Sequence, residues 1–234
     1  MEKEVLERLE KMERELDRYH SRAEIENLMA HYELMQNQKN MAFHPMDFAM
    51  ETSDVSVQIA DGKPYIGPEG IKELFCGLYN IPNYEGILLL HYLTNPAIEV
   101  AGDGKTAKGL WYCPGMETTP KGDGDAEALW IFGTMGIDFI KEDGQWKIWH
   151  MVLCNDFVVR AGVCYQAGPV DEVDPTREEF GTPTLERIVH DPQYNWGDDF
   201  PFMPKPYQSF CDAVSYGPEG NPYTPYYLDK EEQS

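Results

Sequence analysis

The segment from Leu88 to Asp156 restricts the fold more than any other part of the chain. It contains four long runs rich in aliphatic, β-branched and aromatic residues, separated by short polar turns. The turns at 101–104 and 142–144 contain Gly and Asp, which accept the positive φ that tight hairpins need. Runs joined in this way pair antiparallel. We therefore predict four strands, at 88–100, 106–113, 128–141 and 145–156, with a longer loop at 113–125.

The residues before these strands have helical periodicity. One predicted helix begins at a capping box, Ser21-x-x-Glu24, and continues to Gln36. Its apolar face consists of large side chains at helical spacing: Ile25, Leu28, Met29, Tyr32 and Met35. A short helical stretch around 45–50, a strand at 54–60 and a helix from Gly67 follow. Helices followed by a curled meander predict an α+β domain with the helices on one sheet face.

Composition divides the 234 residues into three parts. Residues 1–20 form a predicted helix with an apolar seam at 4-3-4-3 spacing, which we expect to pack on its own domain or on a partner subunit. The seam consists of Val5, Leu9, Met12, Leu16 and Tyr19. Residues 21–160 hold the α+β domain. Residues 161–234 contain ten of the 17 prolines, so we expect an extended segment that packs on the domain or on a neighbouring subunit.

Charge and motif content exclude several classes of function. With 41 acidic and 19 basic residues, the net charge of −22 disfavours nucleic acids and anionic membranes as partners. The longest apolar run, at 86–90, is too short to span a membrane, and the charged N-terminus does not resemble a signal peptide. Five cysteines without a CxxC pair argue against disulfides, so we expect a cytoplasmic protein. No nucleotide-binding glycine loop, HExxH motif or helix-spaced histidine pair occurs, and we expect neither cofactor nor metal.

Several stretches, taken together in their order and spacing, match a known pattern. They are RAEIENLMAHY at 22–32, YIGPEGI at 65–71, HYLTNPAIEVAGD at 91–103, residues 106–112 and DFIKEDGQWKI at 138–148. Over about residues 20–158 the chain resembles the SnoaL-like branch of the nuclear transport factor 2-like superfamily. The resemblance implies a cone-shaped α+β barrel, in which a curved antiparallel sheet wraps three helices around a pocket. The family contains cofactor-free dehydratases, cyclases, isomerases, carbon–carbon lyases and non-catalytic domains, so fold alone does not decide function.

The resemblance implies His91 as the acid–base group and Tyr32 as its partner. A histidine exchanges protons near neutral pH, and a tyrosine hydroxyl can hold a developing oxyanion. Dehydratases of the family carry an aspartate where this chain has Asn37, and a second family carboxylate falls in the Cys113-Pro114-Gly115 stretch, where the nearest acid is Glu117. The alternative is that His91 and Tyr32 are ordinary core residues.

Seven further residues are candidates for binding the substrate. His91 and Asn95 lie four apart in a predicted strand, which places both on one face. The aromatic candidates suit an apolar ring system, and their alternative role is packing in the core. The candidates are Asn37, Asn95, Tyr65, Tyr112, Glu117, Trp130 and His150.

Two functions follow from these residues. The first is a cofactor-independent lyase that eliminates water, or releases formaldehyde by a retro-aldol cleavage, from a small apolar aromatic or polycyclic compound; isomerase or cyclase chemistry is a smaller part of this class. The second is a non-catalytic ligand-binding or oligomerisation domain. A homodimer or homotrimer is expected under either, from an exposed sheet face and the N-terminal seam.

Overall fold

The structure, a computed structural model, describes residues 2–36, 40–59, 62–80, 88–120, 126–161, 203–212 and 215–218. The helical elements are α1 (Glu2–Leu34), the 3-10 helix η1 (Met41–Asp47), α2 (Gly67–Lys72) and the π-helix η2 (Glu73–Leu78). The strands are β1 (Ser56–Ile59), β2 (Tyr65–Ile66), β3 (Leu88–His91), β4 (Thr94–Val100), β5 (Thr106–Pro120), β6 (Ala126–Glu142) and β7 (Gln145–Arg160). Among the described helices, none is long and apolar enough to cross a membrane.

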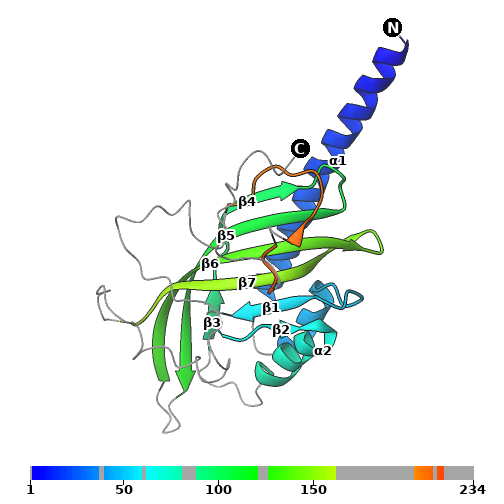
Figure 1. Cartoon of the computed structure of the whole chain (residues 1–234). Helices are drawn as coiled ribbons and strands as arrows, with labels where there is room; N and C mark the ends of the chain where they lie inside the picture. The colour runs from blue at the N-terminus through cyan, green and yellow to red at the C-terminus, as the bar shows by residue number, and fades with distance from the viewer. Residues whose placement is uncertain are drawn as a thin grey trace.

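The strands form one curved sheet with α1 behind it and α2 at its lower edge (Figure 1). The strand order is β2-β1-β7-β6-β5-β3, and β4 also pairs with β5. The predicted turns are present, with positive φ at Gly104, Asp143 and Gly144. Strand β1 pairs parallel with β7, which makes the sheet mixed. The α+β cone predicted from the sequence is confirmed.

Three predicted boundaries are wrong. Helix α1 runs unbroken through Ser21, because the residues before it are strong helix formers that extend the helix across the capping box. The predicted strand 88–100 is two strands, and β5 continues to Pro120 through the predicted loop. Pro114 is tolerated within β5 because it lies opposite the break between β3 and β4, where its carbonyl accepts from Tyr92 N.

The main core lies between α1 and the inner face of the sheet. Ile25, Met29 and Tyr32 of α1 are almost completely buried there. They belong to one buried cluster with side chains of the central strands, which include Trp111, Cys113, Met135, Ile137, Phe139 and Met151. Because residues of α1 and β5 share this core, the C-terminal end of α1 lies close to the part of the sheet that carries the candidate site.

A second buried cluster lies on the outer face of the sheet and is polar. Lys108, Asp138 and His150 are direct cross-strand neighbours, and Lys108 Nζ forms an ion pair with Asp138 Oδ1. Asp138 Oδ2 accepts hydrogen bonds from His150 Nδ1 at 2.9 Å, Ser215 Oγ at 2.8 Å and Tyr216 N at 2.8 Å. Burial alone would raise the pKa of Asp138, but the Lys108 charge and the contact with His150 lower it. The cluster therefore fastens the C-terminal residues to the sheet.

Candidate active site

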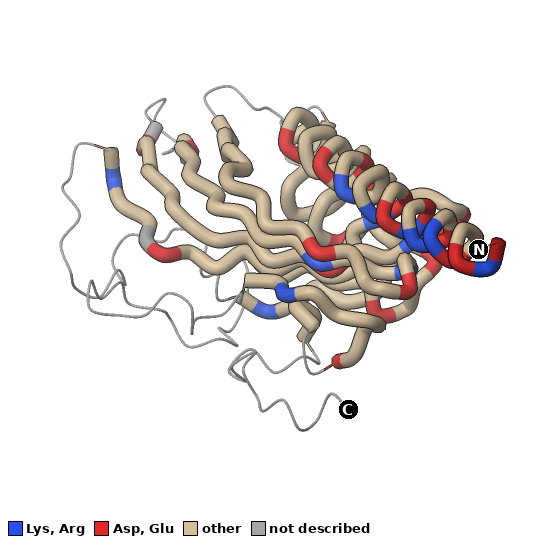
Figure 2. Tube along the Cα trace, turned by 90° about the horizontal axis from the view of Figure 1, so that it is seen from above, with Lys and Arg blue, Asp and Glu red and all other residues tan. Residues whose placement is uncertain are grey.

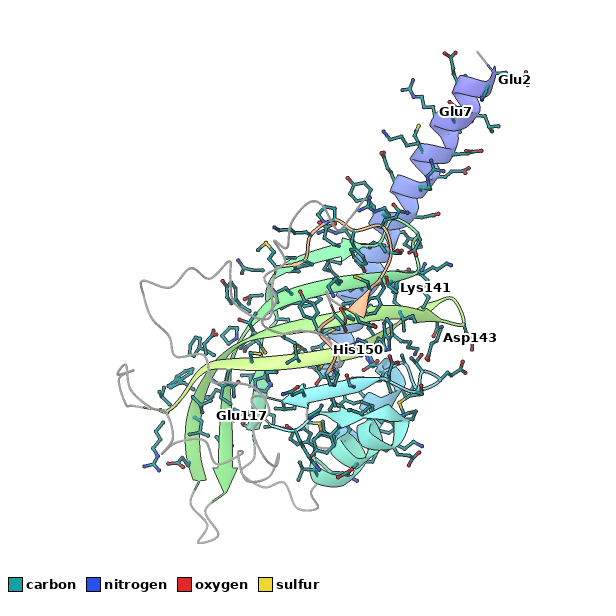
Figure 3. The ribbon with its side chains drawn as sticks, in the orientation of Figure 1. Glu2, Glu7, Glu117, Lys141, Asp143 and His150 are labelled. Carbon is teal, nitrogen blue, oxygen red and sulfur yellow. The ribbon has the colours of Figure 1, made fainter. Side chains whose placement is uncertain are left out.

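The centre of the candidate site is a histidine–carboxylate pair on β3 and β5. His91 pairs with Gly115, and Leu89 pairs with Glu117, so both side chains lie on one face of the sheet. His91 Nε2 lies 2.9 Å from Glu117 Oε1, and both side chains are largely buried. The ring is poorly aimed for a hydrogen bond, and the contact is an ion pair when His91 is protonated. Figure 3 shows Glu117 in the lower part of the sheet, well away from His150.

A second carboxylate reaches this pair from helix α1. Both oxygens of Glu33 are buried without a hydrogen-bond partner among the described residues. Burial raises the pKa of Glu33 from 4.5 to about 7, and the charge of His91 limits the rise. A carboxyl with a pKa near neutrality can both accept and return a proton at physiological pH.

The two carboxylates determine the protonation state of His91. Burial lowers the pKa of His91, but the contact with Glu117 and the charges of Glu117 and Glu33 outweigh it, so the net pKa is raised. The pKa of the Cys113 thiol is raised by burial and by the same two carboxylates. The raised pKa favours the protonated form of His91, which can donate a proton, and the Cys113 thiol stays protonated and is a poor nucleophile.

Tyr32 lies in the core beside Glu33. Its hydroxyl accepts a hydrogen bond from Gln36 Nε2 at 3.2 Å, and its ring lies 4.6 Å from the His44 ring, centroid to centroid. Burial, and next the charge of Glu33, raise the pKa of Tyr32 well above its ordinary value. The hydroxyl is therefore a neutral group, suited to donate a hydrogen bond but not to act as a base.

Unpartnered buried polar atoms gather around these residues. Among the described residues, Gln36 Oε1 and both ring nitrogens of His44 join the two Glu33 oxygens in having no hydrogen-bond partner. Asn155 Oδ1 is a further one, and its residue pairs with Gly133, which itself pairs with Cys113. Buried polar atoms without partners are costly, so their concentration at the end of α1 favours a place where a polar ligand group binds.

The comparisons with known proteins agree with this fold. A family model described as "SnoaL-like domain" matches residues 17–152, more than half of the chain. The chain belongs to the SnoaL-like domain family. No curated protein sequence matches it.

Several solved structures resemble this SnoaL-like domain. A structure titled "The crystal structure of LinA" is 20% identical, with 67% of this chain and 99% of that chain covered and a TM-score of 0.53. A structure of a hexachlorocyclohexane dehydrochlorinase, LinA Type2, is 21% identical, with 65% of this chain and 97% of that chain covered and a TM-score of 0.52. A protein of unknown function from Mycobacterium tuberculosis is 22% identical, with 72% of this chain and 95% of that chain covered and a TM-score of 0.50. At these identities the likeness shows the fold.

The SnoaL-like domain brings some of the predicted site residues together and separates others. His91 and Glu117 meet, and Tyr32 lies next to Glu33. Tyr112 and Trp130 lie on the opposite face of the sheet, where each is about half exposed. Asn37 lies outside the described residues.

Three other candidates lie away from His91 for distinct reasons. Asn95 is exposed in β4, with a φ of 54° at an irregularity in the pairing with β5, so the assumption of one continuous strand is wrong. Tyr65 is buried in β2, with Lys63 Nζ 5.0 Å from its ring centre. His150 is held by Asp138 on the outer face. Alternation along a strand identifies a face only while the strand is unbroken.

Glu33 and Asn155 are the residues that the sequence analysis missed. Glu33 lies four residues after Met29 and eight after Ile25, so it follows the buried face of α1. A carboxylate at such a position is a detectable signal, because burial of an ionisable group costs free energy and is therefore uncommon outside functional or paired sites. Asn155 gives no comparable signal, because its neighbours across the sheet depend on register.

The absence of a side chain at Gly115 leaves room for the His91 ring, and we expect Gly115→Ala to displace that ring. A Cβ at residue 115 would overlap the His91 ring and lie 2.5 Å from the Leu90 carbonyl oxygen, which is backbone and cannot move freely. The ring should leave Glu117, so the pKa of His91 should fall, as measured by NMR titration. Gly77→Ala is the matched control, since its Cβ would meet nothing within 4 Å. An unchanged His91 titration in Gly115→Ala would contradict this role.

Proposed function

We propose that this SnoaL-like protein is a cofactor-independent lyase, in which Glu33 and His91 transfer protons to and from a small apolar, oxygenated aromatic or polycyclic substrate. One observation carries the proposal: a buried, unpartnered carboxyl with a pKa of about 7 interacts with a histidine whose pKa is raised by two acids. The pair provides a proton acceptor and a proton donor in one buried place.

Elimination of water uses both groups in one step. The Glu33 carboxylate takes a proton from carbon, the C–H electrons form a C=C bond, and the C–O bond breaks. His91 gives its proton to the leaving hydroxide, which departs as water. The proton on Glu33 then replaces the one that His91 lost, and Glu117 keeps the imidazole in position.

Release of formaldehyde uses the same groups in a different order. Glu33 takes the proton of a primary hydroxyl, the adjacent carbon–carbon bond breaks, and formaldehyde leaves. The electron pair remains on the other carbon, to which His91 gives a proton. Tyr32 is placed in the proposal as a neutral donor to a substrate oxygen. The aromatic composition of the core around Tyr32, which includes Phe48 and Phe75, favours an apolar ring.

The similar structures support the reaction class at the level of a proposal. One is titled a hexachlorocyclohexane dehydrochlorinase, a name that describes an elimination from an apolar ring. Such a reaction needs a base and a departing group but no redox step.

A non-catalytic ligand-binding domain is the second candidate. Tyr32 is almost completely buried and already accepts a hydrogen bond from Gln36, which favours a structural role for this side chain. In that case the unpartnered atoms of Glu33 and His44 would bind a ligand without transforming it.

A turnover screen distinguishes the lyase from the non-catalytic ligand-binding domain. Hydroxylated diarylpropanes, hydroxysteroids and polyketide-like phenols are incubated with the protein without added cofactor, and products are followed by mass spectrometry. Loss of water or formaldehyde is expected with the wild type, and a decrease of at least about 100-fold in His91→Ala. His20→Ala is the matched control, since His20 is exposed on α1.

Two results would contradict the lyase. Turnover that survives in His91→Ala would remove the proposed mechanism. No turnover of any compound, together with a ligand-induced rise in Tm, would favour the binding domain.

A further inference from the structure

The first half of α1 carries an apolar stripe that no described residue covers. Its five side chains are between 50% and 71% exposed: Val5, Leu9, Met12, Leu16 and Tyr19. Figure 1 shows this half of the helix projecting from the domain. The helix first contacts the sheet at Arg18, whose Nη2 lies 3.7 Å from Glu99 Oε2. The first buried residue of α1 is Ser21. Within the described part of the chain, the stripe is therefore uncovered and available for contact with another molecule.

The first half of α1 buries no residue against the described part of the domain. Most helical stability in proteins comes from packing of an amphipathic face rather than from helix propensity. The ion pairs Lys3–Glu7 and Lys11–Glu15, each with a nitrogen–oxygen distance of 3.8 Å, are exposed, and exposed pairs of this kind contribute little to helix stability. Burial of the stripe against a partner would supply the missing stability.

The spacing of the stripe is that of a two-helix coiled coil. Leu9 and Leu16 take the heptad a positions, and Val5, Met12 and Tyr19 take the d positions. The whole stripe covers more than two heptads, with no polar residue at an a or d position from Val5 to Tyr19. A second helix with the same pattern is therefore the complementary surface.

The flanking charges match a second, parallel copy. Arg8 and Glu15 take g positions, and Glu13 and His20 take e positions. In a parallel pair each g residue faces the e residue five positions later in the other helix. Arg8 then faces Glu13 of the second copy, and Glu15 faces His20. An antiparallel pair would match only Arg8 with Glu15, whereas the parallel pair adds the Glu15–His20 contact, which is an ion pair when His20 is protonated.

The distribution of charge along the chain favours contact at this helix. Residues 1–20 contain seven acidic and five basic side chains, a net charge of −2, and the remaining residues carry the other −20 of the total −22. Figure 2 shows acidic and basic residues interspersed along α1. Two copies of an acidic protein repel each other least where the charge is balanced.

We propose that two copies of this chain associate in parallel through residues 5–19 of α1, which bury their apolar stripes against each other. The pair forms independently of whether the site is catalytic. It holds two domains at the same end of a short coiled coil, with Arg8 and Glu13 facing each other across it.

Sedimentation equilibrium of the full chain tests the association. A mass of two chains is expected at micromolar concentrations, and a monomer is expected for the double variant Leu9→Glu/Leu16→Glu. Met46→Glu, an apolar-to-acidic change at an exposed position of η1, is the matched control and should remain dimeric. A monomeric wild type, a trimer, or a dimer that survives the double variant would overturn the proposal.

Charge exchange tests the orientation. Arg8→Glu places like charges opposite Glu13 and should raise the dimer Kd by about tenfold, because the two symmetric attractive pairs are lost and two repulsive pairs replace them. Adding Glu13→Arg should restore the original Kd. Restoration by Glu15→Arg instead of Glu13→Arg would overturn the parallel arrangement.

Discussion

Glu33→Gln is expected to lower kcat by ~10²–10⁴-fold while it makes the protein more stable at pH 8. The amide keeps the size of the side chain but cannot accept a proton, so the proposed base is lost. The same change removes a buried carboxylate that has no hydrogen-bond partner among the described residues. An activity loss with a stability gain is the pattern expected when a buried ionisable group is kept for its chemistry.

The sign of the stability change follows from the pKa of Glu33. Its folded pKa is raised from 4.5 to about 7, so the folded protein binds this proton more tightly than the unfolded chain does. Wild-type stability from this group is complete below about pH 4.5 and is lost as pH rises through 7. A shift of roughly 2.5 pKa units corresponds to about 3 kcal/mol of unfolding free energy, the gain expected for Glu33→Gln at pH 8.

Urea unfolding at pH 5 and pH 8 measures this gain directly. Glu33→Gln and the wild type should be similar in stability at pH 5 and differ at pH 8. The control is Glu26→Gln, an exposed glutamate of the same helix, which should change neither stability nor kcat. A destabilised Glu33→Gln at pH 8 would mean that the carboxylate has a structural partner, and an active Glu33→Gln would exclude it as the base.

The features predicted correctly from the sequence are local ones. The hairpin turns at Gly104 and Gly144 follow from residues that accept positive φ, and the buried face of α1 follows from 3.6-residue spacing. The sequence identifies His91 and Glu117 separately as candidates but does not show that they meet. The pairing of β3 with the long strand β5 brings the two side chains together.

The features that could not be predicted from the sequence depend on contacts between segments far apart in the chain. The outer-face cluster joins Lys108, Asp138 and His150 from three strands with Ser215 from the C-terminal part of the chain, and only the strand register aligns them. His150 could therefore be identified as a candidate but not assigned to the structural side of the sheet. The buried position of Glu33 also needed the sheet, because helical periodicity alone allows an acid at the edge of an apolar face.

Lys108→Met is expected to have the largest effect on stability, about 3–5 kcal/mol of unfolding free energy. Lys108 and Asp138 are both completely buried, so removal of the ammonium leaves a carboxylate without its ion-pair partner away from water. Lys108 Nζ also lies 4.2 Å from the centre of the Tyr216 ring, and this contact would be lost as well. The methionine keeps the bulk of the side chain, so the loss reports the charge rather than a cavity.

The C-terminal contacts should loosen together with the ion pair. Ser215 Oγ and Tyr216 N both donate to Asp138, and Gly217 N donates to Ser215 Oγ at 2.8 Å. We therefore expect faster hydrogen exchange at the Tyr216 and Gly217 amides in Lys108→Met. Lys141→Met, which removes a lysine that lies above the Trp146 ring near a hairpin turn, is the matched control and should cost less than 1 kcal/mol.

The acid limb of the unfolding curve gives an independent check. The pKa of Asp138 is lowered in the folded state, so its contribution to stability is present above about pH 4 and is lost as pH falls through the folded pKa. In Lys108→Met that pKa should rise, and the wild type and the variant should converge in stability at low pH. The cluster lies on the face opposite Glu33 and His91, so kcat should stay near the wild-type value where the variant is folded. Equal stability of Lys108→Met and the wild type at pH 7 would show that the buried pair adds nothing to the fold.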